Sequence, residues 1–130
     1  MIPLLFDTHA LLTFFNDENN SDIIGSYLEE VDDRARKGYI STITISELSY
    51  LYIRNDMKRE GEACIHALLN TALEVVPVDV NIAISAGNLK KRKISLADAI
   101  IAATAIQVQA TVVTNDTHFD ELGVPRIEYL

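Results

Sequence analysis

Short, uninterrupted apolar runs alternate along the chain with longer segments in which apolar residues recur at helical spacing. An uninterrupted apolar run is typical of a strand that is buried on both faces of a sheet. Such runs predict strands at residues 3–6, 39–43, 74–78 and 111–114, with a further edge strand at 126–129. The periodic segments predict helices at residues 9–15, 21–38, 44–55, 59–73, 79–89 and 96–110.

Strands that alternate with helices indicate a parallel sheet covered on both faces. We therefore expect an α/β fold with three layers, helix–sheet–helix, around a mainly parallel central sheet of four to five strands. Crossovers between parallel strands should be right-handed. In such sheets ligands bind beyond the carboxyl ends of the strands, near the point where the strand order reverses.

Polar residues at the starts of the apolar segments predict where several helices begin. Ser21, Thr44, Asp79 and Ser95 each stand just before a periodic segment and are predicted N-caps. The polar run at residues 16–20 predicts a turn before the helix at 21–38. The helix that follows Ser95 is the most apolar of the chain, with Thr104 the only polar residue between Ala99 and Ile106.

Four carboxylates stand against these apolar segments. Asp7 and Asp116 follow predicted strands, and Glu47 and Asp98 fall in the predicted first turns of their helices. If those helices start at the carboxyl edge of the sheet, all four acids converge there. Two carboxylates about 5 Å apart repel by roughly 3 kcal/mol at an effective dielectric constant of 20. A cluster of four would therefore favour a bound divalent cation.

Each acid also has a purely structural explanation. Glu47 lies three residues after Thr44, and Asp98 three after Ser95, so both fit a capping box, although aspartate is shorter than the usual glutamate. Asp7 could cap the helix that follows it. Asp116 could form an Asx turn. Any one of the acids is explained in this way, but the set of four is harder to dismiss.

Other chemistries find less support in the sequence. His9 and His118 each lie two residues after an aspartate, but a zinc site usually needs three or four nitrogen or sulfur ligands, and there is no HExxH motif or cysteine pair. Oxygen ligands fit Mg²⁺ or Mn²⁺ better. The chain lacks the glycine-rich phosphate-binding motifs and the GxSxG motif of serine hydrolases.

Composition limits the remaining possibilities. The chain has 130 residues, which fits one domain spanning 1–130, and 48% are hydrophobic. No stretch is long enough to cross a membrane, and the apolar N-terminus has no basic leader, so we expect a cytoplasmic protein. Cys64 is the only cysteine, so no intrachain disulfide can form. The net charge of −8 argues against a large nucleic-acid footprint, although positive charge gathers at Lys90–Lys93 and at Arg54, Lys58 and Arg59.

The arrangement of motifs resembles the PIN domain and, within that family, the small VapC-like toxins. The resemblance covers essentially the whole chain. The matching segments are the apolar strand into Asp7-Thr8-His9-Ala10-Leu11, the helix start Ser46-Glu47-Leu48, the run Leu96-Ala97-Asp98-Ala99 with the apolar residues after it, and Thr114-Asn115-Asp116-Thr117-His118-Phe119. Each motif is weak alone, and their order and separations give the resemblance its weight.

The resemblance implies an Mg²⁺- or Mn²⁺-dependent endoribonuclease that acts on single-stranded RNA. It implies that Asp7, Glu47, Asp98 and Asp116 bind the metal, and it makes Thr8, Ser46 and Thr114 candidates for orienting ligands or water. It also implies a small antitoxin protein as partner and a homodimer. Two alternatives remain open: a PIN nuclease in RNA processing or decay without an antitoxin, and a PIN-like module that binds RNA or protein without catalysis.

Overall fold

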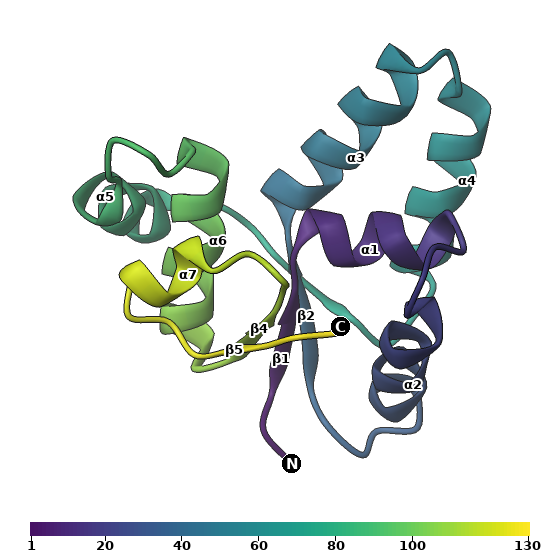
Figure 1. Cartoon of the computed structure of the whole chain (residues 1–130), viewed down its shortest axis with the longest axis horizontal. Helices are drawn as coiled ribbons and strands as arrows, with labels where there is room; N and C mark the ends of the chain where they lie inside the picture. Colours follow the sequence, from purple (N-terminus) through teal and green to yellow (C-terminus); the bar gives the residue numbers. More distant parts are fainter.

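A computed structural model describes all residues, 1–130, and its centre is a sheet of five parallel strands (Figure 1). The strands are β1 (Leu4–Phe6), β2 (Gly38–Ser41), β3 (Glu74–Val76), β4 (Thr111–Val113) and β5 (Arg126–Ile127), in the order β3-β2-β1-β4-β5. The helices are α1 (Thr8–Phe15), α2 (Ser21–Asp32), α3 (Thr42–Arg54), α4 (Lys58–Leu69), α5 (Val80–Leu89), α6 (Leu96–Val108) and α7 (His118–Glu121).

The central strand β1 supplies side chains to both faces of the sheet. All three of its residues are buried, as an uninterrupted apolar run predicts. Leu4 and Phe6 enter one hydrophobic core, and Leu5 enters the other. This alternation follows from the period of two along a strand, which places successive side chains on opposite faces.

Helices cover each face of the sheet. Helices α1, α2, α3 and α4 supply the core that contains Leu4 and Phe6, whereas α5, α6 and α7 supply the core that contains Leu5. Figure 1 shows these two groups on opposite sides of the strands. The predicted three-layer α/β/α fold with a parallel sheet of four to five strands is therefore confirmed, with five strands. None of the helices is both long and apolar enough to span a bilayer.

Of the four N-caps predicted at helix starts, two are confirmed and two are wrong. Asp79 and Ser95 do cap their helices, accepting hydrogen bonds from Ile82 N at 2.8 Å and Asp98 N at 3.1 Å. The predicted cap at Ser21 is wrong, because Asn20 occupies the N-cap position in a left-handed conformation and its side chain makes no capping bond. The predicted cap at Thr44 is also wrong, because Ser41 caps α3.

Several predicted boundaries also differ from the structure. The helix predicted at 21–38 ends at Asp32, and the chain then turns through Arg34 at φ 63 before entering β2. The strand predicted at 39–43 occupies Gly38–Ser41, and the helix predicted at 59–73 occupies Lys58–Leu69. The short helix α7 was not predicted, since four residues are too few to show a helical period.

The strand order brings the carboxyl ends of β1 and β4 together. The chain moves from β1 to β2 and β3 on one side and returns to β4 on the other side of β1, so the order reverses between β1 and β4. Helix α3 starts directly after β2, and α6 runs back towards the start of β4. Both helices therefore begin at the carboxyl edge, where parallel α/β sheets bind their ligands.

Candidate active site

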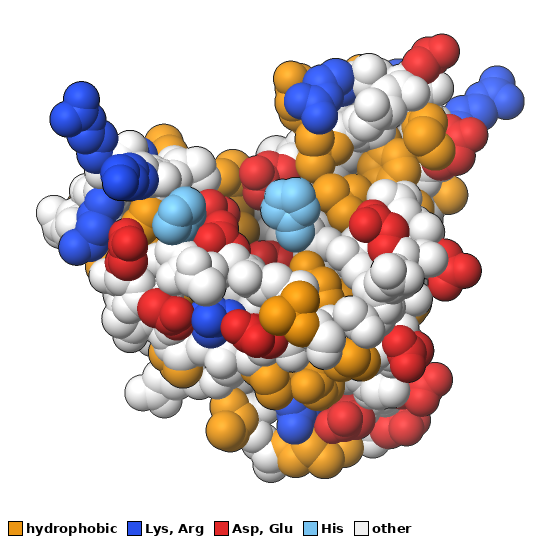
Figure 2. Space-filling view, in the orientation of Figure 1, with side chains coloured by type: hydrophobic (Ala, Val, Ile, Leu, Met, Phe, Trp, Pro, Cys, Tyr) orange, Lys and Arg blue, Asp and Glu red, His pale blue; other side chains and the backbone are white.

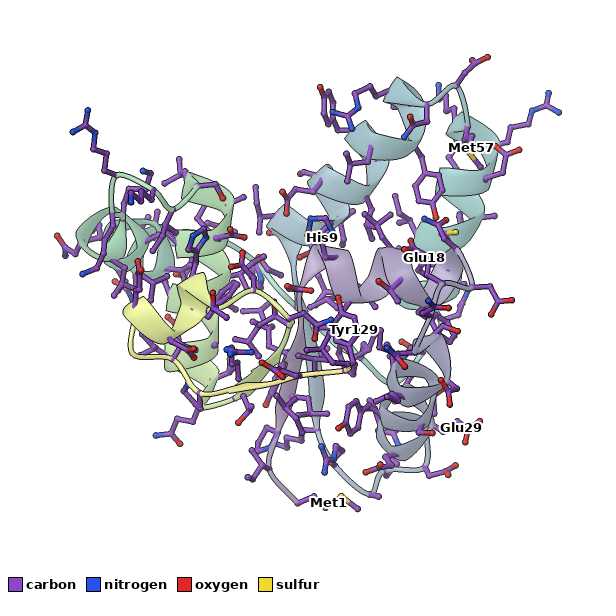
Figure 3. All side chains as sticks on the ribbon, in the orientation of Figure 1. Met1, His9, Glu18, Glu29, Met57 and Tyr129 are labelled. Carbon is purple, nitrogen blue, oxygen red and sulfur yellow. The ribbon has the colours of Figure 1, made fainter.

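A cavity of about 190 Å³ lies at this carboxyl edge, and seven of its eight lining residues are polar. It is lined by Asp7, Thr8, His9, Glu47, Leu51, Ser95, Asp98 and Asp116. In the space-filling view acidic side chains show in a hollow near the top of the molecule (Figure 2), and His9 lies beside this hollow at the start of α1 (Figure 3). The four carboxylates that are far apart in the sequence thus share one small space.

Asp7 joins β1 to α1 and is the most buried of the four acids, with 5% of its surface exposed. Its Oδ1 accepts a hydrogen bond from Ala10 N at 2.7 Å, so the predicted N-cap role is confirmed. Burial raises its pKa to about 6, although hydrogen bonds from Thr114 and Ala10 partly counteract the increase. A carboxyl group with such a pKa is poorly solvated, and a nearby cation would favour its charged form.

Glu47 lies one turn further along its helix than the sequence predicts. Because α3 begins at Thr42, Glu47 falls in the second turn, and the capping-box explanation for its carboxylate is wrong. The hydroxyl of Thr8 instead donates to Glu47 Oε1 at 2.6 Å, and the Oγ1 atoms of Thr8 and Thr44 are 3.3 Å apart. This buried contact ties α1 to α3 and holds the carboxylate at the cavity.

Asp98 lies in the first turn of α6, as predicted. Burial raises its pKa, and repulsion from Asp116 and Glu47 raises it further, whereas the hydrogen bond involving Ser95 and the nearby His9 lower it. Asp98 also contributes to the raised pKa of Asp7. The acids therefore lie close enough to interact electrostatically, as a cluster at one site must.

Asp116 is held in a well-defined loop after β4. Its Oδ1 accepts from His118 N at 2.9 Å, which confirms the predicted Asx turn, and lies 3.3 Å from His118 Nδ1. The Thr114 hydroxyl oxygen accepts from Asp116 N at 3.0 Å, and Asn115 Oδ1 accepts from Tyr129 N at 2.9 Å. Thr114 therefore connects the Asp116 loop to Asp7, whose carboxylate it also contacts.

The supporting polar residues fall into two groups. Thr8 and Thr114 are buried and contact the acids, as described above. Ser46 is exposed and does not line the cavity, so we exclude it from the site. Ser95 lines the cavity, although the sequence suggested only a capping role for it. The signal that could have identified Ser95 is its position one turn before Asp98, because a cap lies at the same end of the helix as the first-turn acid.

The cavity has the donor chemistry of a site for a hard divalent cation. As the side chains stand, no three histidine, cysteine, aspartate or glutamate residues are grouped so that they could hold one ion together. Mg²⁺ commonly retains several waters and binds through only one or two carboxylates, so it does not need such a group. Two acids with raised pKa values and two further carboxylates in one cavity fit an ion of this kind.

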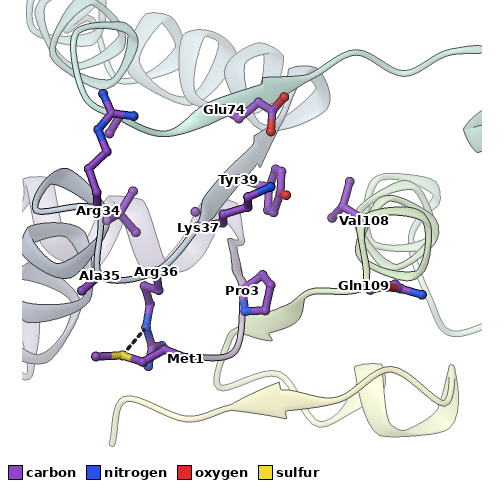
Figure 4. A pocket seen from close by; sticks show the side chains of 13 residues that line it. Met1, Pro3, Arg34, Ala35, Arg36, Lys37, Tyr39, Glu74, Val108 and Gln109 are labelled. Carbon is purple, nitrogen blue, oxygen red and sulfur yellow. Dashed lines mark hydrogen bonds between the residues drawn. The ribbon is translucent and has the colours of Figure 1, made fainter.

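A larger cavity of about 900 Å³ lies at the opposite, amino edge of the sheet (Figure 4). Arg34, Arg36 and Lys37 contribute to its lining. Arg36 already pairs with Glu30 at 3.2 Å and contacts the Met1 sulfur. This cavity contains no group of acids, so it is not a second candidate for the same chemistry.

Comparisons with known proteins identify the family and the fold. The family described as "PIN domain" matches residues 4–125. A structure of VapBC2 from Rickettsia felis bound to a promoter DNA fragment has a TM-score of 0.81 at 22% identity, over 98% of both chains. DNA-bound VapBC from Salmonella typhimurium has a TM-score of 0.76 at 24% identity, over 100% of both chains.

A third similar structure is that of VapC20 from Mycobacterium tuberculosis, described as a toxin that cleaves the sarcin–ricin loop. Its TM-score is 0.76 at 16% identity, over 95% of this chain and 98% of that chain. No curated protein sequence matches the chain. At these identities the solved structures establish the shared fold.

Proposed function

This chain belongs to the PIN domain family, and on that basis we propose that it is a metal-dependent endoribonuclease that hydrolyses phosphodiester bonds of single-stranded RNA. The observation that supports this proposal most directly is the convergence of Asp7, Glu47, Asp98 and Asp116 on one cavity. The four carboxylates come from four separate segments of the chain, and neither the cap formed by Asp7 nor the Asx turn formed by Asp116 requires them to meet.

Asp7 and Asp98 are the proposed principal metal ligands, with Glu47 and Asp116 completing the site directly or through water. Mg²⁺ or Mn²⁺ bound there would lower the pKa of water and offset charge on the phosphate. The Thr8 hydroxyl holds the Glu47 carboxylate in place, and Thr114 contacts both the Asp7 carboxylate and the backbone of Asp116. The half-buried Asp116 orients the attacking water, and His9 lines the same cavity beside the acids.

We further propose that the protein is the toxin of a VapBC-type pair. The similar structures from Rickettsia felis and Salmonella typhimurium are VapBC complexes, which supports a small antitoxin protein as partner. An acidic cavity suits an arginine side chain from such a partner. A homodimer is part of the same proposal. A PIN nuclease that works in RNA processing or decay without an antitoxin is the second candidate, because the cavity would be the same.

The test is cleavage of labelled single-stranded RNA in Mg²⁺ or Mn²⁺, for the wild type, the wild type with EDTA, Asp7→Asn and Asp98→Asn. We expect cleavage that requires metal and is lost in both variants. Asp79→Asn is a matched control, because Asp79 caps α5 as Asp7 caps α1 but lies outside the cavity. It should cut as the wild type does.

Two results would contradict the proposal. Full activity of Asp98→Asn would show that the acidic cavity is not the site of RNA cleavage. A folded wild type that cuts none of several RNAs and shows no metal binding in a calorimetric titration would favour the third candidate, a PIN-like module that binds RNA or protein without catalysis.

A further inference from the structure

One wall of the acidic cavity is a face of α3 that continues outward beyond the acids. Glu47 and Leu51 both line the cavity, and Arg54 follows them at the next helical step on the same face. Tyr50, one turn before Arg54, is 61% exposed, and the Arg54 guanidinium stacks 5.6 Å from the centre of its ring. This wall therefore presents an exposed cation and an exposed aromatic ring next to the acids.

The opposite wall is formed by the start of α6 and the loop before it. Ser95 and Asp98 line the cavity, and the four residues Lys90–Lys93 lie immediately before them, at and after the end of α5. All four of these cationic side chains are exposed. In Figure 2 lysine and arginine side chains stand on both sides of the hollow that contains the acidic side chains.

The cations of the two walls have no acidic partner, which is also true of Arg34, Lys37, Lys58 and Arg59; what sets the wall cations apart is their position beside the acidic cavity. Arg36 pairs with Glu30, and Arg126 pairs with Asp120 and Glu128. Neither Arg54 nor any residue of Lys90–Lys93 forms an ion pair. In a chain with 19 acidic residues and a net charge of −8, unpaired cations that gather around an acidic cavity are available to an anionic ligand.

Helix stabilisation explains only part of this arrangement. Arg54 lies in the last turn of α3 and Lys90 at the end of α5, where positive charge favours the helix dipole. Lys91, Arg92 and Lys93 lie beyond α5, where that effect has fallen off. The helix dipole also does not explain the exposed ring of Tyr50, which carries no charge.

We propose that the two walls form the binding groove for single-stranded RNA, with Lys90–Lys93 contacting phosphates on one side of the cavity and Arg54 and Tyr50 contacting the strand on the other. This inference rests on the proposed ribonuclease function and identifies its substrate-holding surface. Exposed cations supply sequence-independent affinity for the backbone. An exposed aromatic ring can stack on an unpaired base, which is available in a single strand and hidden in a duplex.

The test measures binding of a fluorescein-labelled oligouridylate to the metal-free protein by fluorescence anisotropy, in EDTA so that no cleavage occurs. We compare the wild type with Lys91→Gln/Arg92→Gln, Arg54→Gln and Tyr50→Ala. Arg34→Gln/Lys37→Gln is the matched control, because it removes two exposed cations at the amino edge of the sheet.

The Lys91/Arg92 variant should bind about tenfold more weakly, and its dependence of affinity on salt should become shallower by about 0.7 in log–log slope for each lost phosphate contact. Tyr50→Ala should weaken binding with an unchanged salt slope, since stacking releases few ions. The control should bind as the wild type does. Thermal unfolding of each variant confirms that it remains folded.

Hydrolysis of bis(p-nitrophenyl) phosphate with Mn²⁺ separates this inference from the proposed function, because that substrate is too small to reach the walls. If the wall variants hydrolyse bis(p-nitrophenyl) phosphate as the wild type does but bind RNA more weakly, the result supports both the ribonuclease function and the RNA groove. RNA binding that falls equally in the control, or that falls in no variant, overturns the groove even if the enzyme is active. Loss of affinity for polyglutamate without loss of affinity for RNA would assign the walls to an acidic protein and would also overturn the proposal.

Discussion

The Thr8 hydroxyl donates a hydrogen bond to Glu47 Oε1 at 2.6 Å, across 39 positions of sequence. Thr8 is buried and is the first residue of α1, directly after Asp7. The same short segment therefore supplies one acid of the cavity and fixes the position of another. A metal ligand is commonly held in this way by a hydrogen bond from a neighbouring side chain.

Replacing Thr8 with valine should reduce metal-dependent RNA cleavage by about tenfold to a hundredfold, because Glu47 loses the donor that holds it. Valine has nearly the same shape, so the protein should remain folded and lose about 1 kcal/mol of stability. Steady-state cleavage and a Mn²⁺ titration measure the loss of function, and urea unfolding measures the loss of stability. Thr8→Ser keeps the hydroxyl and should retain most of the activity, as should Ser46→Ala, whose side chain lies outside the cavity. Equal activity of Thr8→Val and wild type would contradict this role.

Without metal, the buried Asp7 carboxylate should destabilise the fold at neutral pH. Its pKa is raised from 3.8 to about 6, so the folded state binds more protons than the unfolded state between these values. The free energy of unfolding therefore falls as pH rises through this window, by about 3 kcal/mol from this group alone. Asparagine does not ionise, so Asp7→Asn should keep this stability and should be more stable than the wild type at pH 7 in EDTA.

Urea unfolding of wild type and Asp7→Asn across this pH range, in EDTA, isolates the contribution of Asp7, because the other acids are present in both. The difference in stability should shrink as the pH is lowered. A difference that does not vary with pH would show that burial does not raise the pKa of Asp7. Added Mg²⁺ should stabilise the wild type and leave Asp7→Asn unchanged.

Ser95→Ala should lower stability by about 1 kcal/mol, because α6 loses its side-chain cap. The pKa of Asp98 should rise further, since the hydrogen bond that involves Ser95 lowers it. NMR titration of Asp98 in the metal-free protein measures the second effect. Asp79→Ala provides the comparison, because it removes the cap of α5 at a similar cost and should not change the titration of Asp98. An unchanged Asp98 titration in Ser95→Ala would disprove the coupling.

Two glycines in helices should respond in opposite directions to replacement by alanine. A Cβ at Gly61 would lie 2.6 Å from the Cβ of the buried Tyr52, so Gly61→Ala should cost about 1–3 kcal/mol as α4 is pushed from α3. A Cβ at Gly87 meets nothing within 4 Å, and Gly87→Ala should stabilise α5 by up to about 1 kcal/mol. Thermal unfolding of both variants checks the pair, and destabilisation by Gly87→Ala would show that this exposed face packs against something.

The sequence alone predicts those features that depend on a few neighbouring residues. The apolar runs at β1 and β4 are typical of strands buried on both faces, and Asp7 and Asp116 follow them at the same edge because the two strands are parallel. The caps at Asp7, Asp79 and Ser95 depend on contacts within three residues, and all three form as expected.

Tertiary structure determined the start of α3 and therefore the position of Glu47. Ser41 and Thr44 are both acceptable N-caps, so local preference does not choose between them. Pairing of Ser41 with Val76 in the sheet ends β2 at Ser41 and lets the helix begin there. This shift of three residues moves Glu47 out of the first turn, leaves Ser46 exposed and buries Thr44 near Thr8.

The four acids and their family pattern could thus be identified from the sequence, but their meeting in one cavity could not. Convergence requires the order β3-β2-β1-β4-β5, which places β1 beside β4 and brings the start of α6 to the same edge. Strand order depends on which faces and edges bury the most apolar surface together, a property of the whole chain. Hydrophobic periodicity shows only which face of each segment is apolar. It therefore predicts the helices and strands, whereas their arrangement depends on how they pack together in the core.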